Sequence, residues 1–432
     1  YNTDNLPTTV TDQEDKDSRV EYDNEGRILK TIDGAGNQIV YTYDETLAST
    51  VSSYKPVRVD YPTFSRKYSY DNLERVVQEV DVLDENTSHT RSYGYDAAGN
   101  IIAAADEQDH TTQFAYDALN RLVQTTDPLN GVTRRTYDDR GNLIAIENHN
   151  NGITYYEYDR NNRLTKTIRP MLQETAFEYD SAGNRTAVYD TKGQKIAYDY
   201  NALNRLTQVR YYAAGDHAAP VKTVYFTYDK LGNIQSYDDG TTSAAYTYDD
   251  LQQKIGESVD YGLFTFDTAY SYYAHGLKKT FTGPDGVTSS YSHDENNRLA
   301  GIAIPGQGLV TYNYDPEHWN SPAGKILPGG SNESYSYDPL MRLKSIMTKD
   351  PGQNTLMTRD YTYSAAGNII AKNTEHGNYH FQYDKLQRLT EAVNPLSTDE
   401  AYTYDPLGNR LTATGVPGDW RYNANNELLA YD

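Results

Sequence analysis

Tyrosine followed by aspartate recurs along this chain at a spacing close to 21 residues. The spacing is kept five times in succession by six tyrosines, Tyr95, Tyr116, Tyr137, Tyr158, Tyr179 and Tyr200. A fixed period of this size indicates one small structural unit that is copied many times. It also favours an extended surface or an enclosing wall over a single active-site pocket, because the units of a repeat protein contact mainly their neighbours.

Each unit contains two short runs of strand-forming residues and two turns. In one example, residues 131–137 are the first run, 138–142 the first turn, 143–146 the second run and 147–151 a second turn that closes at Gly152. Two strands and two turns fill about 21 residues, which predicts tandem β-hairpins.

The turn after each tyrosine has a clear chemical signature. Its aspartate side chain accepts hydrogen bonds from the backbone two residues further on, and a Gly-Asn pair supplies residues that tolerate a positive φ. An Arg-Leu pair usually opens the second strand. We therefore predict structural roles for the repeated tyrosine, aspartate, glycine and arginine. These residues are Tyr95, Asp96, Gly99, Tyr116, Asp117, Arg121, Tyr137, Asp138, Gly141, Tyr158, Asp159, Arg163, Tyr179, Asp180, Gly183, Tyr404, Asp405, Gly408 and Arg410.

A second aromatic residue usually stands two positions before the repeated tyrosine, as Phe114 does before Tyr116 and Tyr156 before Tyr158. Residues two apart in a strand share a face. We expect these rings to stack on one another across strands while the tyrosine hydroxyls face water. Aliphatic residues are too few for a sandwich core. The sequence therefore predicts an all-β fold in which tandem hairpins form a long curled sheet, one layer thick.

Composition excludes several classes of partner. The net charge of -22 argues against nucleic acid and against anionic membrane surfaces. The chain has no cysteine, so disulfides and thiolate metal sites are impossible. No apolar run is long enough to span a membrane. The first residues, Tyr1 and Asn2, form neither a start nor a signal peptide, so we expect a fragment whose targeting signals lie elsewhere.

We expect one array over residues 1–432. It contains about 19 repeats whose repeated tyrosines, here called anchors, run from Tyr22 to Tyr422. Five anchor pairs depart from Tyr-Asp, among them Tyr273-Ala274 and His293-Asp294. Residues 1–19 are expected to form an irregular acidic segment, in which Asp12, Glu14, Asp15 and Asp17 are more typical of a solvated loop than of a cation site.

The repeated unit resembles a known family. Tyr-Asp-x-x-Gly-Asn-Arg-Leu, as in residues 404–411, is similar to the YD repeat of Rhs proteins, of the Tc toxin C component and of teneurins. The resemblance covers the chain from about Val20 to Tyr422. It implies a sheet that spirals into a hollow cocoon. In bacterial members the cocoon encloses a C-terminal toxin that a type VI secretion system or a Tc apparatus delivers, whereas in teneurins the shell carries adhesion surfaces.

The same resemblance implies partners and a location. The partners are the remainder of the shell, the enclosed toxin domain and a delivery apparatus, and the protein is secreted or exported to the cell surface. Bacterial members often end the repeats with a self-cleaving segment of the DPxG type. In this chain Asp405-Pro406-Leu407-Gly408 continues into Asn409 and Arg410, which is an ordinary repeat turn.

The sequence contains no pattern that indicates catalysis, a cofactor site or a metal site. Exposed tryptophan stacks well on sugars, so Trp319 and Trp420 are candidate carbohydrate contacts. Two hypotheses remain. The first is a non-catalytic shell segment of an Rhs or Tc-type toxin. The alternative is a cell-surface adhesion or carbohydrate-binding YD-repeat module.

Overall fold

The computed structural model describes residues 6–11, 17–43, 55–315, 321–416 and 418–431. These residues form 39 β-strands and, within those ranges, no helix. Thirty-seven strands belong to one antiparallel sheet, and β38 and β39 form a separate two-stranded sheet. The predicted all-β fold of tandem hairpins is confirmed. No helix of the described ranges is long and apolar enough to cross a membrane.

The chain divides into two compact units, where we expected one array. Unit 1 contains residues 1–131, here called the first strip, and residues 290–419, the second strip. The strands of the first strip are β1 (Thr9–Thr11), β2 (Asp17–Tyr22), β3 (Ile28–Ile32), β4 (Gln38–Thr42), β5 (Arg58–Asp60), β6 (Ser65–Tyr70), β7 (Val76–Val82), β8 (Ser88–Tyr95), β9 (Ile101–Ala105), β10 (Thr111–Tyr116) and β11 (Leu122–Thr126). Those of the second strip are β26 (Thr288–His293), β27 (Leu299–Ile304), β28 (Gly308–Tyr314), β29 (Pro322–Ile326), β30 (Asn332–Tyr337), β31 (Leu343–Lys349), β32 (Thr355–Tyr363), β33 (Ile369–Thr374), β34 (Gly377–Tyr383), β35 (Leu389–Val393), β36 (Glu400–Tyr404) and β37 (Arg410–Ala413).

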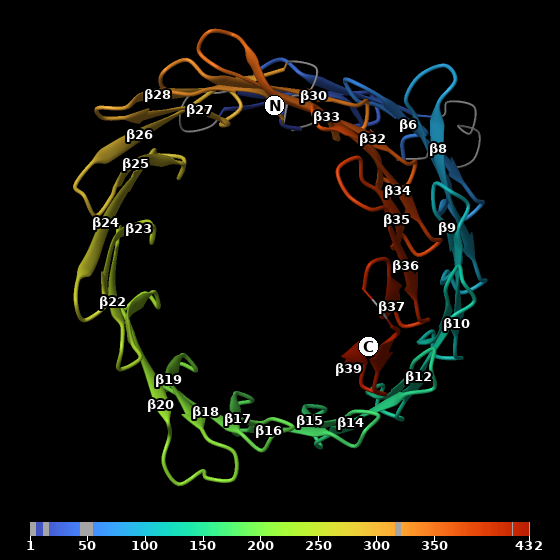
Figure 1. Ribbon diagram of the computed structural model, residues 1–432, viewed down its shortest axis with the longest axis vertical. Helices are drawn as coiled ribbons and strands as arrows, with labels where there is room; N and C mark the ends of the chain where they lie inside the picture. Colours follow the sequence, from blue (N-terminus) through green and yellow to red (C-terminus); the bar gives the residue numbers. More distant parts are fainter. Residues whose placement is uncertain (1–5, 12–16, 44–54, 316–320, 417, 432) are drawn as a thin grey trace. The chain divides into compact units, whose positions relative to one another are not determined.

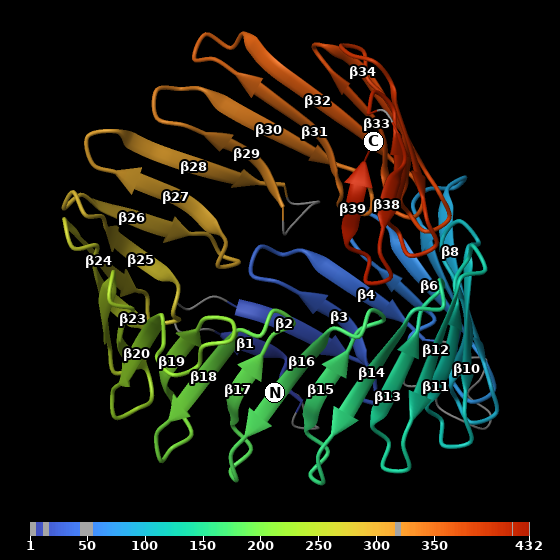
Figure 2. The same cartoon turned by 60° about the horizontal axis from the view of Figure 1, so that its bottom comes forward.

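Unit 2 contains residues 132–289, here called the middle strip, and the hairpin of residues 420–431. Its strands are β12 (Val132–Tyr137), β13 (Leu143–Glu147), β14 (Ile153–Tyr158), β15 (Leu164–Ile168), β16 (Glu174–Tyr179), β17 (Arg185–Tyr189), β18 (Lys195–Tyr200), β19 (Leu206–Tyr212), β20 (Lys222–Tyr228), β21 (Ile234–Asp238), β22 (Ser243–Tyr248), β23 (Lys254–Asp260), β24 (Thr265–Tyr272), β25 (Lys278–Thr282), β38 (Trp420–Tyr422) and β39 (Leu428–Tyr431). Within the middle strip, successive strands from β14 to β19 lie side by side in chain order (Figures 1 and 2).

Most anchors end the first strand of their unit at a β-bulge, whereas β4 ends at Thr42, before Tyr43, and pairs with β5 without a register shift. In β12 and β13, Thr136 pairs with Ala145 while Tyr137 pairs with Leu143, so one residue of β13 has no partner. At the other end of β13, the pairing of β13 with β14 continues up to Glu147 and Ile153 without a register shift. A bulge bends its strand and increases the local twist. Because the bulges recur on one edge of the strip, each hairpin bends in the same sense.

The sheet is one layer thick and has almost no core. Within the described ranges, the buried hydrophobic residues are few and mostly small, and none of the large side chains is fully buried. The accessible surface is 25325 Å² for a chain of 48.8 kDa. A compact monomer of that mass exposes about 17,000 Å². Stability therefore comes from neighbouring strands and turns and not from the filling of an interior.

Two predictions, one about the N-terminal segment and one about the position of an anchor, need correction. Residues 1–19 were expected to be irregular, but Thr9–Thr11 pairs with Asp17, Ser18 and Arg19 as β1 with β2. Tyr273 was taken as an anchor, but the bulge and the end of β24 fall at Tyr272, and Tyr273 occupies the aspartate position of the turn. Two consecutive tyrosines made the sequence ambiguous at this unit.

Candidate functional site

The five-residue turn after each anchor, here called the YD turn, is held by its aspartate. In the turn 138–142, Asp138 Oδ1 accepts hydrogen bonds from the backbone N–H of Arg140 at 2.9 Å and of Asn142 at 2.8 Å. Its Oδ2 accepts one from Asn142 Nδ2 at 2.9 Å. The Asp138 N–H also donates to the Asn142 carbonyl at 2.9 Å. One carboxylate thus satisfies the backbone of the whole turn, as in an Asx turn.

The fourth residue of the YD turn adopts a positive φ. Gly99, Gly141 and Gly183 have φ values of 94°, 88° and 95°, which confirms the conformation predicted for Gly141. In the alternate turns this position belongs to asparagine, with φ 60° at both Asn120 and Asn162. Glycine and asparagine are the residues that tolerate this region best. The asparagine of a Gly-Asn pair instead occupies the fifth position and binds the aspartate.

The anchor hydroxyls bind the backbone, where we expected them to face water. Tyr158 Oη donates to the Leu143 carbonyl at 2.9 Å, and Tyr179 Oη to the Leu164 carbonyl at 2.8 Å. Except at Tyr22 and Tyr70, which bind the carbonyls of Pro7 and Pro56, the acceptor is the first residue of the strand that follows the preceding YD turn. The anchors with such a bond are Tyr22, Tyr43, Tyr70, Tyr95, Tyr116, Tyr158, Tyr179, Tyr200, Tyr228, Tyr248, Tyr272, Tyr314, Tyr337, Tyr363, Tyr383 and Tyr404.

Arginine at the fifth position forms one kind of link between successive units, here called the Arg joint. Arg163 Nε donates to Asp159 Oδ2 at 2.7 Å, and its Nη1 donates to the Asp180 carbonyl of the next YD turn at 2.8 Å. The guanidinium lies 4.8 Å from the ring centroid of the next anchor, Tyr179. The other arginines over the next anchor are Arg27, Arg75, Arg205, Arg298, Arg342 and Arg388.

These cation–π contacts correct the expectation that the anchor rings stack mainly on one another. One predicted pair, Tyr68 and Tyr70, does stack, with ring centroids 6.3 Å apart. At the Arg joints named above, however, the described neighbour of the anchor ring is a guanidinium. An arginine over an aromatic face combines a charge–quadrupole attraction with its hydrogen bonds.

Asparagine at the fifth position forms the second kind of link, the Asn joint. Asn142 Nδ2 donates to Oδ1 of Asn162, the fourth residue of the next YD turn, at 3.0 Å. The same bond, at the same distance, joins Asn100 to Asn120 and Asn184 to Asn204. In residues 95–204 turns ending in Gly-Asn and in Asn-Arg alternate. A polar chain therefore runs along the YD-turn edge, with Asn and Arg joints in turn.

The predicted arginines do not all have the same place. Arg121 and Arg163 occupy the fifth turn position and bind Asp117 and Asp159 through Nε, each at 2.7 Å. Arg410 is instead the first residue of β37, with its guanidinium 5.4 Å from the Tyr402 ring centroid. Asn409 takes the fifth position and binds Asp405 Oδ2 at 2.8 Å. The arginine of the Arg-Leu pair thus has two possible places. It is the fifth residue of the YD turn where Asn is the fourth, and the first residue of the next strand where Asn is the fifth.

The turn carboxylates are poised to stay ionised. The side-chain hydrogen bond from Asn142 holds the pKa of Asp138 below its ordinary value, and the bond from Asn184 does the same for the pKa of Asp180. For Asp159 the largest cause of the lowered pKa is the backbone hydrogen bond from Arg163. Hydrogen bonds to the charged form always act in this direction.

A second feature of the fold is a seam at which turns far apart in sequence meet. In unit 1, Asn296 Nδ2 donates to Asp33 Oδ2 at 2.7 Å, and Gln387 Nε2 donates to Asp106 Oδ2 at 3.1 Å. In unit 2, Asn425 Nδ2 donates to Gln173 Oε1 at 2.8 Å. These contacts span 263, 281 and 252 residues. In every case a YD turn later in the chain meets the opposite kind of turn, here called the second turn, of an earlier hairpin.

Glycine is required where the seam is tightest. A Cβ on Gly34 would lie 2.4 Å from the Glu295 carbonyl oxygen, so any side chain would push the two strips apart. The next residue, Ala35, donates its N–H to Asn296 Oδ1 at 2.8 Å. At this point the backbones of the two turns lie close together, and side-chain hydrogen bonds such as that from Asn296 to Asp33 hold them.

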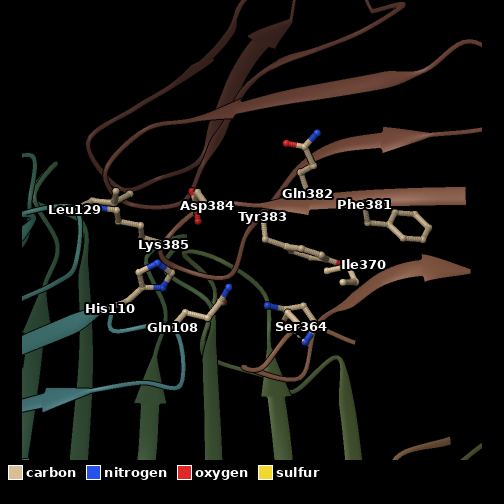
Figure 3. Close-up of a pocket in the computed structure, with 11 residues that line it drawn as sticks. Gln108, His110, Leu129, Ser364, Ile370, Phe381, Gln382, Tyr383, Asp384 and Lys385 are labelled. Carbon is tan, nitrogen blue, oxygen red and sulfur yellow. Dashed lines mark hydrogen bonds between the residues drawn. The ribbon is translucent and has the colours of Figure 1, made fainter. Parts of the chain in front are cut away.

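A cavity of about 460 Å³ opens beside the seam of unit 1. Gln108 and His110 approach from the first strip, while Tyr383, Asp384 and Lys385 approach from the second (Figure 3). The Asp384 carboxylate is already bound by Arg388 Nε at 2.7 Å. The described polar groups serve the two turns, so this arrangement indicates a joint between strips and offers no organised reaction site.

The remaining candidate residues are not assembled into a site. Trp319 lies outside the described residues, as do Asp12, Glu14 and Asp15. Trp420 is half-buried in β38, and Asp17 accepts a hydrogen bond from Thr11 Oγ1 at 2.6 Å. Within the described ranges, no group of three or more histidine or acidic side chains is arranged to hold a metal ion. Sequence reasoning missed the seam, for which no local signal exists.

Comparison with known proteins identifies the fold. The family described as Teneurin YD-shell matches residues 57–219. No curated protein sequence matches the chain significantly. The crystal structure of TcdB2-TccC3-Cdc42 aligns with 97% of the chain at a TM-score of 0.69 and 15% sequence identity. A Tc holotoxin pore of Photorhabdus luminescens aligns with 96% of it at a TM-score of 0.74 and 17% identity.

The chain spans about a quarter of the length of these solved chains, 27% of the first and 24% of the second. At such identities the likeness establishes the fold, and it agrees with the family match and with the tyrosine–aspartate turns in both units. The chain has the YD-shell fold, and its residues 57–219 match the Teneurin YD-shell family.

Proposed function

We propose that this chain is a non-catalytic wall segment of a shell that encloses a toxin domain located C-terminal to the repeats, in an Rhs or Tc-type toxin. The observation that carries this proposal is the thinness of the structure. Its accessible surface of 25325 Å² exceeds the value of about 17,000 Å² expected for a compact protein of 48.8 kDa. A protein that binds or reacts in a pocket gains nothing from such a surface, whereas a wall requires it.

The seam supports the same proposal. A wall must be tight between strips as well as along them, and the strips meet through hydrogen bonds such as the one from Asn296 to Asp33. Gly34 permits backbone contact at that point. The net charge of -22 suits a secreted protein that must stay soluble with both faces wet. Its partners are then the rest of the shell, the enclosed domain and a delivery apparatus.

Small-angle scattering of the monomer tests the wall. A compact chain of 432 residues has a radius of gyration of about 22 Å. We expect a clearly larger radius and the profile of a hollow or open particle. A radius at the compact value with the profile of a solid sphere would refute the wall.

Enclosure is tested separately in the longest natural polypeptide that contains these repeats. The region after them should resist trypsin while the YD repeats are folded, and it should be cut once they melt. Cleavage at equal rates before and after melting would mean that the YD repeats do not enclose the region that follows them. The adhesion alternative then becomes the better explanation.

A further inference from the structure

Two hairpins of the chain end in the same four-residue loop. The first tip, residues 60–66, contains Asp60-Tyr61-Pro62-Thr63-Phe64, and the second tip, residues 260–266, contains Asp260-Tyr261-Gly262-Leu263-Phe264. The tyrosine N–H donates to the phenylalanine carbonyl at 2.9 Å in the first tip and 3.0 Å in the second. The two rings stack in both, with centroids 4.6 Å and 5.1 Å apart. The two tips therefore share a closing hydrogen bond and a ring stack, but their turn types differ, because Gly262 has a φ of 80° where Pro62 is restricted to a negative φ.

The first tip is docked on a YD turn. Thr63 Oγ1 donates to the carbonyl of Pro339, the second residue of the turn 338–342 in the second strip, at 2.7 Å. Tyr61 and Phe64 are half-buried there. Burial raises the pKa of Tyr61, which agrees with a ring withdrawn from water.

The second tip is exposed. Leu263 is 95% exposed, and Phe264 is 53% exposed. A third ring, Phe266, lies edge-on to Phe264 with centroids 5.1 Å apart. The equivalent residue of the first tip is Arg66, which is paired with Asp81. The second tip therefore presents a larger apolar surface than the first, and exposed clusters of this kind mark interaction sites.

YD turns show what such a tip binds. Three YD turns of the second strip contact the first strip, and in two of them the third residue is a half-buried leucine, Leu340 or Leu386. The same position in five other YD turns carries a leucine that is 64 to 70% exposed. These residues are Leu73, Leu119, Leu203, Leu231 and Leu251. The turn leucine is thus half-buried in two turns that contact the first strip and largely exposed in the five turns named above.

The second tip also lies on the edge of the middle strip that already takes part in a seam. It is a second turn, as is the turn 169–173, where Met171 donates its N–H to Asn425 Oδ1 of the YD turn 423–427 at 3.2 Å. The docking edge of that strip therefore continues past the terminal hairpin toward the second tip.

We propose that the tip formed by Tyr261, Leu263, Phe264 and Phe266 is a docking knob for the YD-turn edge of another length of YD repeat. Leu263 takes the place of Thr63 and contacts a turn leucine, so apolar contact replaces the hydroxyl–carbonyl bond of the docked tip. The knob thus extends the seam to an additional wall strip. A second copy of this chain carries exposed YD turns and serves as the probe.

The chain has no cysteine, which allows a single label. Leu263→Cys is labelled with a benzophenone maleimide and mixed with unlabelled chain under light, and the cross-linked residues are identified by mass spectrometry. In parallel, sedimentation velocity measures the association constant of the unmodified chain and of the double variant Leu263→Asp, Phe264→Asp. Val221→Asp is the matched control, because Val221 is 71% exposed and lies outside the tip.

We expect cross-links on YD turns, centred on their leucines, and at least a tenfold loss of association in the double variant with no loss in the control. Leu231→Asp, on the opposite side of the contact, should weaken association to a smaller degree, because other turn leucines remain. The proposal is overturned if the unmodified chain stays monomeric across the micromolar range. It is equally overturned if cross-links avoid YD turns, or if the knob binds phosphatidylcholine vesicles in a Phe264-dependent manner in place of a second chain.

Discussion

The Arg joint and the Asn joint solve the same problem with different chemistry. Between turns 138–142 and 159–163, a single amide bond of 3.0 Å joins Asn142 to Asn162. Between turns 159–163 and 180–184, Arg163 binds its own aspartate, the next turn's carbonyl and the next anchor ring together. Both joints keep neighbouring anchors in register, but only the Arg joint connects the turn edge to the tyrosine face of the sheet.

The difference indicates which links between hairpins contribute most to the stability of the fold. A neutral amide–amide bond at the surface contributes little, because water competes for both groups. A guanidinium that is fixed by a carboxylate and covers a ring removes apolar surface from water as well. Alternating the two joints places a strong link at every second hairpin. The weaker links between them are expected to open first.

Alkaline pH should have the largest effect, because it acts on the anchors of both joints. Burial raises the pKa of Tyr70 to about 12 and raises the pKa of Tyr158 and Tyr314. The unfolded value is about 10. The raised pKa means that the contribution of these tyrosines to stability is complete below a pH of about 10 and is lost as the pH rises through their folded-state pKa, which is about 12 for Tyr70.

Tyrosinate absorbance and circular dichroism, followed together, check this prediction. The loss of β signal should coincide with ionisation. Burial is the main cause of the raised pKa of Tyr314; the negative charge of Asp294 raises it further, and the Arg298 guanidinium opposes the rise to a smaller degree. Complete ionisation with an unchanged β signal would contradict the structural role of the hydroxyl bonds.

Arg163→Ala should produce the largest effect of a single substitution. It removes the bond to the Asp180 carbonyl and the guanidinium over Tyr179, and we expect a loss of roughly 2 kcal/mol in the free energy of unfolding. Arg160→Ala is the matched control, because Arg160 is exposed in the same turn. Urea unfolding of both variants measures the difference. Equal losses of unfolding free energy in the two variants would mean that the contacts of the Arg joint contribute nothing beyond the positive charge of an arginine in this turn.

Gly141→Val should be next in size. Gly141 has a φ of 88°, and a Cβ added to it would meet no heavy atom within 4 Å beyond its chain neighbours, so the effect isolates backbone strain. A β-branched residue in this region costs about 1 to 2 kcal/mol. Gly141→Asn should be almost neutral, because asparagine occupies the same position in the alternate turns, as at Asn162. This explanation would be refuted if thermal unfolding showed Gly141→Asn to be as unstable as Gly141→Val.

The Asn joint itself should have the smallest effect, about 0.5 kcal/mol, because the bond from Asn142 to Asn162 is an exposed amide–amide bond. Asn142→Ala removes this bond together with the part-buried bond to the Asp138 carboxylate. A double-mutant cycle with Asn162→Gly, which retains the positive φ and deletes the amide, isolates the Asn joint. We expect a coupling energy well below the effect of Arg163→Ala. A coupling energy equal to that effect would erase the distinction between the two joints.

Local features of this fold could be predicted from the sequence because each is set within a few residues. The period, the hairpin at residues 131–152 and the positive φ of Gly141 all follow from strand-forming runs and turn chemistry. The same reasoning failed at Tyr272 and Tyr273, where two tyrosines compete for one position. It also assigned the anchor hydroxyls to water, because the acceptor carbonyl lies in the preceding unit, 15 residues away for Tyr158.

The seam could not be predicted, for a different reason. Which turn meets which depends on the bend that each bulge adds, summed over all the hairpins between the two turns. An error of a few degrees per hairpin would bring Asn296 to another turn than 33–37. Gly34 therefore looks like any other turn glycine in the sequence, although its hydrogen atom is what lets Glu295 approach.

The span of the seam has a consequence for the order of folding. A hairpin closes a loop of about 20 residues, whereas the contact of Asn296 with Asp33 closes one of 263. The entropy of closure grows with the logarithm of loop length, which makes the longer closure about 2 kcal/mol more costly if the chain between is flexible. The seam is therefore favourable only after the intervening hairpins have stiffened. During synthesis, the first strip must wait with an uncovered edge until the ribosome has delivered more than half of the chain.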